Sequence, residues 1–205
     1  MIFEILKPKA KLILASSSPR RGQILKNAKI DFDAYAPHVD ERRHPRESAR
    51  ACVLRIAMMK ARAAAAHAKQ KKHHAIVVGA DTVVVAKGQI LGKPSDVKDA
   101  RRMLRMLSGK THQVLTGLAI LNAPNGEEIR HVETTRVRFA RLSPKEIDDY
   151  IATGEPFDKA GAYGIQGIGG RFVTSVDGCF FNVMGLPLSR LCALLRGAGW
   201  PELSS

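Results

Sequence analysis

The 205-residue sequence has little cysteine, few aromatic residues and no long hydrophobic run. Its three cysteines, Cys52, Cys179 and Cys192, are far apart, which argues against a disulfide framework and against a structural zinc site. The most apolar runs, such as 75–80, have the length of a β-strand and fall far short of the ~20 residues that span a bilayer. The first 15 residues lack the continuous apolar region of a signal peptide. These absences predict a cytoplasmic protein with no membrane partner.

Positive charge is what the sequence has in excess. Its 33 Lys and Arg against 19 Asp and Glu give a net charge of +14 at pH 7, which favours an anionic partner. Nucleic-acid-binding proteins usually combine basic patches with stacking aromatic side chains, but aromatic residues make up only 5% of this sequence. A small anionic ligand therefore fits the sequence better than nucleic acid, which stays as the competing class.

Apolar periodicity and turn residues predict strands alternating with helices. We expect strands at 11–15, 31–37, 75–85, 89–92, 114–121 and 128–139, and helices at 19–29, 47–69, 95–107, 143–154 and 186–195. The glycine-rich segment 160–170 is predicted to be a loop or a distorted strand, and 172–183 a β-hairpin that turns at Asp177-Gly178. The length and this mixture predict one domain over residues 1–205, of the α/β or α+β class, around a mixed sheet.

The turn after the first strand, Ser16 to Arg21, is the first candidate anion site. Ser18 is suited to cap the following helix, and Pro19 to its first position, where a missing N–H has no consequence. Arg20 and its neighbour add positive charge to a helix end that is already positive. Free N–H groups, serine hydroxyls and two guanidinium groups together form a phosphate site. The alternative is that the serines only cap the helix and the arginines extend into solvent.

Four more charged residues lie at positions that suit a site. Asp81 interrupts the apolar run AIVVGADTVVV, where a carboxylate needs a metal, a lysine or a helix N-terminus, unless it turns outward. Lys60 borders the apolar face of its predicted helix, Lys93 follows a short strand, and Glu41 follows a strand exit. Each alone is an ordinary solvated charge, so their significance depends on whether they meet in space.

A series of short motifs runs in order along nearly the whole chain. They are LASSSPRR at 14–21, VDE at 39–41, KA at 60–61, GADT at 79–82, LGKP at 91–94, SG at 108–109, TG at 116–117, DKAGAYGIQG at 158–167, N at 182 and GLPL at 185–188. Together they resemble the Maf family of nucleoside triphosphate pyrophosphatases. The resemblance implies an α/β fold similar to inosine triphosphatase, with an elongated mixed sheet flanked by helices and two lobes around a central cleft. It also suggests a homodimer.

The resemblance further implies an activity and a set of residues. Such enzymes cleave between the α- and β-phosphates of a nucleoside triphosphate and need a divalent cation, Mg²⁺ or Mn²⁺. The presence of Arg20, Thr82 and Gln166 matches the dTTP/UTP type rather than the 7-methyl-GTP type, in which an aromatic residue tends to replace Arg20. We therefore expect the catalytic residues Asp81, Glu41, Lys60 and Lys93, the substrate-binding residues Ser16, Ser18, Arg20, Arg21, Thr82 and Gln166, and the metal ligands Glu41 and Asp81.

Elementary chemistry agrees with these assignments. A triphosphate has up to four negative charges and needs several cations, and a hard cation such as Mg²⁺ prefers oxygen ligands. Aspartate has an ordinary pKa of about 3.9, so Asp81 either has a raised pKa or acts on a water molecule held by the metal. The side-chain amide of Gln166 can pair with one edge of a pyrimidine. Two alternatives remain open: a non-catalytic nucleotide- or nucleic-acid-binding protein, and specificity for 7-methyl-GTP.

Overall fold

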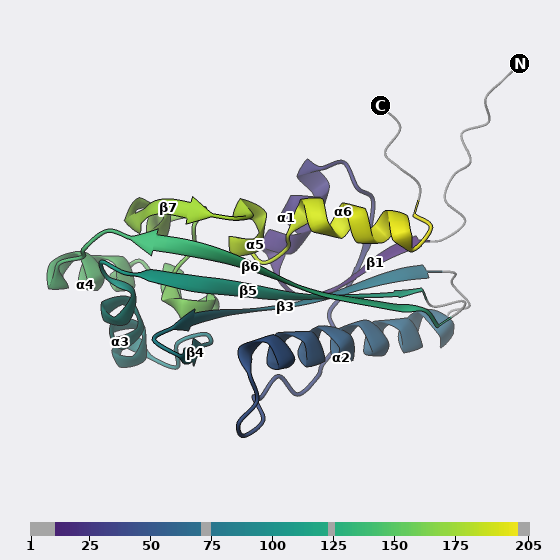
Figure 1. Ribbon diagram of the computed structural model, residues 1–205, viewed down its shortest axis with the longest axis horizontal. Helices are drawn as coiled ribbons and strands as arrows, with labels where there is room; N and C mark the ends of the chain where they lie inside the picture. Colours follow the sequence, from purple (N-terminus) through teal and green to yellow (C-terminus); the bar gives the residue numbers. More distant parts are fainter. Residues whose placement is uncertain (1–10, 71–74, 123–125, 201–205) are drawn as a thin grey trace, which may run out of the picture.

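A mixed β-sheet forms the centre of the computed structural model, which describes residues 11–70, 75–122 and 126–200 (Figure 1). Its strands are β1 (Lys11–Ala15), β2 (Asp33–Tyr35), β3 (Ala75–Ala86), β4 (Gln89–Leu91), β5 (Thr111–Asn122), β6 (Glu128–Phe139) and β7 (Val173–Asp177). The order across this seven-stranded sheet is β2-β1-β3-β5-β6-β7, and β4 pairs with one end of β3. β1 is parallel to β2 and β3, whereas the other neighbours are antiparallel.

Helices cover both faces of this sheet. They are α1 (Pro19–Asn27), α2 (Ala49–Gln70), α3 (Val97–Leu107), α4 (Pro144–Ala152), α5 (Phe180–Val183) and α6 (Leu188–Gly197), with the 3₁₀ turns η1 (Glu155–Asp158), η2 (Ala160–Ala162) and η3 (Ile168–Phe172). Figure 1 shows α2 on one face, α1 and α6 on the other, and α3 and α4 at one end of the sheet. The predicted α/β class with a mixed sheet is confirmed. No helix within the described residues has the length and apolar character needed to span a membrane.

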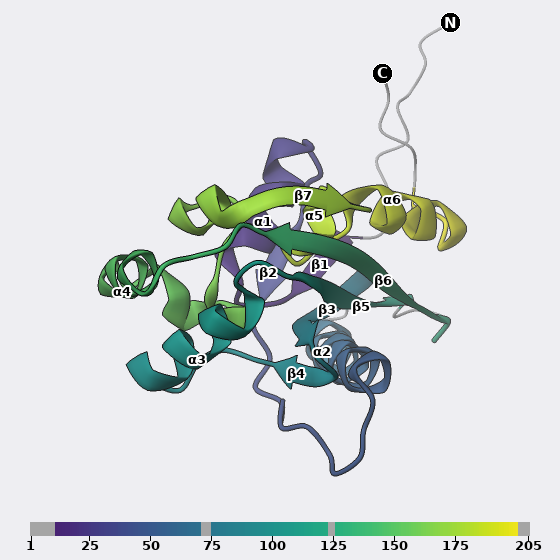
Figure 2. The ribbon, with the colours of Figure 1, turned by 60° about the vertical axis from the view of Figure 1, so that its left-hand side comes forward.

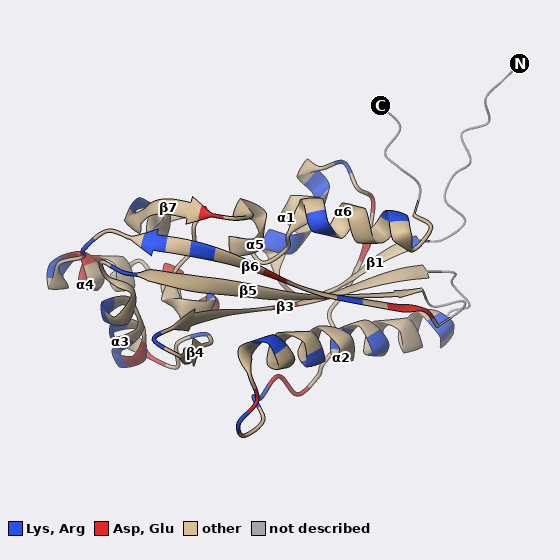
Figure 3. Ribbon diagram, viewed as in Figure 1, with Lys and Arg blue, Asp and Glu red and all other residues tan. Residues whose placement is uncertain are grey.

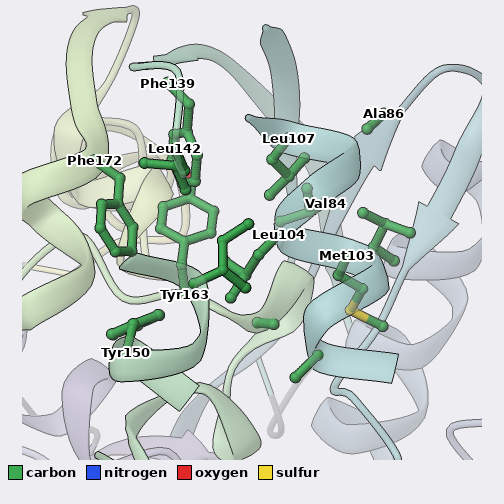
Figure 4. Close-up of a cluster of buried hydrophobic side chains, with 14 of the residues drawn as sticks. Val84, Ala86, Met103, Leu104, Leu107, Phe139, Leu142, Tyr150, Tyr163 and Phe172 are labelled. Atoms are coloured by element: carbon green, nitrogen blue, oxygen red, sulfur yellow. The ribbon is translucent and has the colours of Figure 1, made fainter. Parts of the chain in front are cut away.

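Most buried hydrophobic side chains lie in cores at the two ends of the elongated sheet, and a smaller cluster contains Val53, Val83, Leu115 and Val132. At one end, α1 and α6 pack on one face around Leu118, and α2 packs on the opposite face around Ala61. At the other end, α3, α4 and the ends of β5 and β6 enclose a core that includes Leu104, Phe139 and Tyr163 (Figure 4). The 12-residue strands β3 and β5 pass through both ends and join them. This division corresponds to the two predicted lobes.

One edge of β3 is uncovered near its middle. β1 pairs with β3 only over Ala75–Gly79, and β4 pairs with it only over Val84–Ala86, on the same edge. In the part of the chain that the structure describes, residues 80–83 therefore have no strand beside them on this edge, although β5 continues along the other edge. In this gap the side chain of Arg21, rather than a strand, donates to the carbonyl of Ala80, next to Asp81.

The alternation of side chains along β3 places these two residues on opposite faces. Val77 belongs to the core under α2, so Asp81, four residues later, points to the α2 face. Val78 belongs to the core under α1 and α6, so Thr82 points to that face. Both can reach one pocket only because the sheet edge is open between β1 and β4.

The segment 172–183 is not the predicted hairpin. Its first half is β7, which pairs with β6, but 180–183 forms the short helix α5. The turn is at Gly178, with φ of 121°, and side chains then hold the chain over the sheet. The amide of Asn182 donates to the carbonyl of Val114 and to the hydroxyl of Thr135, which also accepts from the N–H of Cys179. These bonds replace the strand pairing that the apolar pattern suggested.

Candidate active site

A pocket of about 630 Å³ opens at the uncovered edge of β3. Its walls come from the β1–α1 turn, the connection before α2, α2 itself, β3, the segment after β4 and the glycine-rich segment that follows η1. Figure 2 shows how the long β2–α2 connection extends past the sheet beside α2. The pocket is lined by all the predicted site residues: Ser16, Ser18, Arg20, Arg21, Glu41, Lys60, Asp81, Thr82, Lys93 and Gln166.

Lys60 joins two carboxylates at the centre of the pocket. Its Nζ lies 3.0 Å from Oδ1 of Asp81 and 2.9 Å from Oε1 of Glu41. The side chains of Lys60 and Asp81 are buried, whereas that of Glu41 is 55% exposed. Burial raises the pKa of Asp81 above its ordinary value, although Lys60 and Arg21 act in the opposite direction. The pocket thus holds a carboxylate with increased proton affinity beside a fixed ammonium group.

Two glycines allow α2 to bring Lys60 to Asp81. A Cβ atom on Gly79 would lie 2.1 Å from the carbonyl oxygen of Ala57, and one on Gly117 would lie 2.4 Å from that of Val53. The α2 backbone therefore rests directly against β3 and β5, with no side chain between them at these points. This close approach explains the glycines of the GADT and TG motifs by packing rather than by contact with a ligand.

Arg21 is buried under the pocket and holds several elements together. Its Nε donates to the carbonyl of Gly185, Nη1 to Ser16 Oγ and to the carbonyl of Ala80, and Nη2 to Thr82 Oγ1, over 2.7–3.0 Å. Burial lowers the pKa of Arg21, and nearby Asp81 partly restores it. Within the described residues, four of the five guanidinium N–H groups thus donate to the protein, and the fifth has no recorded partner.

A chain of hydroxyl groups continues from Arg21 with a fixed direction. Thr82 Oγ1 lies 2.9 Å from Thr116 Oγ1, which lies 3.3 Å from the carbonyl oxygen of Asn182. A carbonyl only accepts, so the single proton of Thr116 is used there and the bond between the hydroxyls must be donated by Thr82. Thr82 therefore accepts from Arg21 and donates to Thr116. Its hydroxyl can accept a hydrogen bond from a ligand but has no proton to donate to one.

Arg20 reaches across the pocket to the segment that follows α4. Its Nη1 lies 2.8 Å from Oδ2 of Asp158, whose Oδ1 lies 2.6 Å from Nζ of Lys159. Partial burial would raise the pKa of Asp158, but the hydrogen bonds from Lys159 and Arg20 dominate and lower it to about 2. One ionised carboxylate therefore holds two cations at the pocket wall.

The remaining predicted residues lie around this centre. Ser16 Oγ accepts from Arg21 and from the N–H of Ser18, which is at the N-cap position of α1 but makes no capping bond with its side chain. The predicted capping bond to the Ser18 hydroxyl is therefore absent. Lys93 and Gln166 are exposed and line the pocket, and the carbonyl of Gly92, next to Lys93, accepts from the N–H of Gly161.

Arg43 and Asp158 also line the pocket and are absent from the predicted set of site residues. Asp158 lies inside the DKAG motif, so its position next to Lys159 is a signal that sequence reasoning could have used. Arg43 follows the VDE motif in a charged loop with no apolar pattern, and nothing in the sequence distinguishes it from its neighbours. Its Nε donates to the carbonyl of Glu47.

The donor chemistry of this pocket fits a divalent cation. Glu41 and Asp81 converge on one point, occupied by the Lys60 ammonium group, and carboxylate oxygens are the ligands that Mg²⁺ and Mn²⁺ prefer. Within the described residues no three His, Cys, Asp or Glu side chains form a cluster that could hold a metal. Two protein carboxylates are therefore the available set, and a cation here needs oxygen ligands from a phosphate or from water to complete its shell.

The comparisons with known proteins agree with the motif pattern. The sequence profile of the family described as Maf-like protein matches residues 11–198. The chain belongs to the Maf family. Among its Maf relatives, a dTTP/UTP pyrophosphatase of Geobacillus sp. (strain WCH70) is 53% identical, over 92% of this chain and 98% of the relative. A protein of the same name from Anaeromyxobacter sp. (strain Fw109-5) is 50% identical, over 93% and 91%. Another, from Dictyoglomus thermophilum, is 44% identical, over 95% and 100%.

A comparison of this Maf protein with solved structures also gave a match to another protein. The nucleoside-triphosphatase, or dITP/XTP pyrophosphatase, of Mycobacterium abscessus aligns with 95% of this chain and 100% of its own length. The TM-score is 0.40 and the sequence identity is 13%. The fold assignment above rests on the sheet and helices of the chain itself.

Proposed function

We propose that this protein hydrolyses dTTP and UTP to the nucleoside monophosphate and pyrophosphate. The observation that carries the proposal is the buried Asp81, held by Lys60 in a pocket that is lined with cations from separate elements. The names and high identity of the Maf relatives support the substrate class. Non-catalytic binding is less well supported, because a purely binding site for a polyanion has no need of a buried carboxylate beside the anion.

The triphosphate would lie between the two sides of the pocket. Arg20 and Lys93 line the pocket, and Arg21 would supply charge with its one remaining N–H group. The hydroxyl of Ser18 and the N-terminal end of α1 favour a phosphate group. Together these groups neutralise charge that increases on the departing pyrophosphate, which is the main contribution a protein can make to phosphoryl transfer.

Asp81 would act as the general base. Lys60 bonds to Oδ1 and leaves Oδ2 to accept a proton from water, and a raised pKa makes the carboxylate a better base near neutral pH. The water oxygen attacks the α-phosphorus, its proton passes to Asp81, and the bond between that phosphorus and the oxygen that bridges to the β-phosphorus breaks. The electron pair of the broken bond leaves with pyrophosphate, so the charges and atoms balance.

A divalent cation would be held by Glu41 and Asp81. When bound it would supply charge neutralisation at the phosphates. Lys60 has the same two carboxylate partners and would stay beside them as a fixed positive charge. We therefore expect Lys60 to keep Glu41 and Asp81 together before substrate arrives.

Base selection would depend on Gln166 at the pocket rim. Its exposed amide carries a donor and an acceptor, which match the adjacent acceptor and donor on one edge of uracil or thymine. Thr82 would contribute through Arg21 rather than by donating to the base, because its proton is already used. Arg20 would also take part in base selection, and its ion pair with Asp158 would hold it in position.

The proposal extends to the organisation of the chain. One Maf-like domain over residues 1–205 is supported by the shared strands β3 and β5, which pass through both hydrophobic ends of the sheet. A cytoplasmic homodimer remains an expectation from the family resemblance.

The test is pyrophosphate release from a panel of nucleoside triphosphates with Mg²⁺ or Mn²⁺, with and without a chelator. We expect chelator-sensitive release from dTTP and UTP and little from ATP. Release only from 7-methyl-GTP would keep the chemistry and contradict the specificity. No release from any triphosphate would contradict the enzyme assignment, and gel-shift titration with DNA would then test the nucleic-acid alternative.

A further inference from the structure

Gln166 lies in a segment whose two ends are tied to the same pair of side chains. The N–H of Gly164 donates to the hydroxyl of Tyr150 over 3.3 Å. The N–H groups of Ile168 and Gly169 donate to the carboxylate of Glu155 over 2.8 and 3.1 Å. The hydroxyl of Tyr150 in turn donates to Oε1 of Glu155 over 2.8 Å. The loop from 164 to 169 is thus fastened at both ends to one hydrogen-bonded pair.

The glycines of this loop are explained by the same pair. A Cβ atom on Gly167 would lie 2.4 Å from Oε2 of Glu155, and one on Gly169 would lie 2.6 Å from the Tyr150 hydroxyl. A Cβ atom on Gly164 would lie 2.5 Å from the side chain of Lys159. The loop backbone therefore lies directly on these side chains. Its glycine content follows from close packing rather than from a need for freedom of movement.

The pair is itself firmly held. Tyr150 is 2% exposed, and its ring packs edge-on against Phe172 with a centroid distance of 5.0 Å (Figure 4). Burial tends to raise the pKa of Glu155, but the loop N–H groups and the Tyr150 hydroxyl more than compensate and lower it, so the carboxylate is ionised and accepts only. An ionised acceptor strengthens hydrogen bonds from backbone N–H groups.

We propose that Tyr150 and Glu155 are positioning residues for substrate selection, because they fix both ends of the loop that presents Gln166 to the pocket. Neither residue lines the pocket. Their effect would fall on the orientation of the Gln166 amide rather than on Asp81 or Lys60, which lie on other elements. The inference rests on the proposed function, in which Gln166 contacts the base.

Tyr150→Phe is the cleanest variant, because it keeps the ring against Phe172 and removes only the hydroxyl. We expect the ratio of kcat/KM for dTTP to kcat/KM for dATP to fall about threefold to tenfold, the value of one or two hydrogen bonds. Glu155→Gln should lower the ratio further, because its amide NH₂ would face a group that also donates. Tyr35→Phe is the matched control, since Tyr35 stacks on His67 and does not line the pocket.

A double-mutant cycle separates positioning from a general structural effect. In a Gln166→Ala background the selectivity that depends on the amide is already lost, so Tyr150→Phe should change the ratio no further. Additive effects of the two substitutions would overturn the inference. An unchanged ratio in both Tyr150→Phe and Glu155→Gln would overturn it as well.

Amide hydrogen exchange tests the same inference without any activity. The N–H groups of Ile168 and Gly169 should exchange faster in Glu155→Gln than in the wild type, while those of β5 stay unchanged. If the wild type releases no pyrophosphate, the proposed function fails and substrate positioning fails with it. If the wild type does discriminate between nucleotides but Glu155→Gln exchanges these N–H groups no faster than the wild type, the inference is overturned and the proposed function stays intact.

Discussion

Asp81 illustrates how a single buried carboxylate links activity to stability. Its pKa is raised by burial, so the folded state binds a proton more tightly than the unfolded state does. As pH rises through the ordinary range of an aspartate and through this raised pKa, the folded state loses stability relative to the unfolded chain. Above this raised pKa the charged Asp81 is therefore a destabilising feature, as expected for a residue with the proposed role of general base.

Asp81→Asn should separate these two properties. The neutral amide removes the burial penalty while Glu41 still pairs with Lys60, so we expect the melting temperature to stay equal or rise. Pyrophosphate release should fall by about 10²-fold or more, the usual contribution of a general base. Thermal unfolding and a steady-state assay on the same preparation measure both effects. Full activity in this variant would contradict the role of Asp81 as base and as metal ligand together.

His112 makes the stability of the fold depend on pH, and it lies outside the residues that line the pocket. It is 2% exposed, its Nε2 lies 2.8 Å from the Tyr163 hydroxyl, and burial lowers its pKa to about 4. The unfolded chain, with an ordinary histidine pKa, binds the proton first as pH falls. The stabilising effect of neutral His112 is therefore complete above about pH 6.5 and is lost toward pH 4.

His112→Phe should flatten this dependence. Between pH 7 and pH 5 the wild type should lose about 2 kcal/mol of unfolding free energy through this one group. The variant lacks the hydrogen bond to Tyr163 and should start less stable, but its loss over the same interval should be smaller. Urea unfolding at the two pH values measures the difference. Equal losses in the two proteins would show that another group titrates.

Among the secondary-structure elements, those with strong local signals were predicted best. Pro19 at the first turn of α1 and the capping box of Ser143 and Glu146 mark helix starts, and both are present in the structure. The helix α5 was predicted as a strand, because what holds it are bonds from Asn182 to residues of β5 and β6 that are far away in the sequence. A local pattern has no access to such contacts.

The sequence predicted residues that line one pocket, but it did not predict how they are arranged there. Motif order identified the charged groups, but the link from Lys60 to both carboxylates follows from the register of β3 against β1 and from the depth at which α2 packs. The direction of the Thr82 proton depends on Thr116 and on a carbonyl of α5. Neither register nor proton direction can be read from residue types along one chain.

The contact of α2 with the sheet can be tested at Gly79. In Gly79→Ala the added methyl group would lie 2.1 Å from the carbonyl of Ala57, so α2 must move outward. We expect a loss of about 3 kcal/mol in unfolding free energy and reduced activity, because Lys60 moves with the helix. Gly197→Ala, in α6 with nothing within 4 Å of the new Cβ, is the control and should be neutral or slightly stabilising. A fully active and stable Gly79→Ala would contradict the close packing.

At the scale of the whole molecule, the net charge of +14 is spread over many elements. Figure 3 shows Lys and Arg on α2, α3, α6 and β6 rather than on one patch. A distributed positive field attracts a polyanionic substrate from a distance, and salt screens it over about 10 Å at 0.1 M. The field can therefore increase the rate of encounter with a nucleotide without contributing any contact to the bound state.

This steering predicts a specific response to salt. We expect kcat/KM for dTTP to fall several-fold between 50 and 300 mM NaCl. Lys98→Glu with Arg105→Glu reverses two exposed charges of α3 that do not line the nucleotide pocket. It should lower kcat/KM at low salt, leave kcat unchanged and converge with the wild type at high salt, because screening removes the difference. If the two proteins instead show the same salt dependence at every concentration, the pocket cations alone attract the substrate and the remaining surface charge serves another purpose.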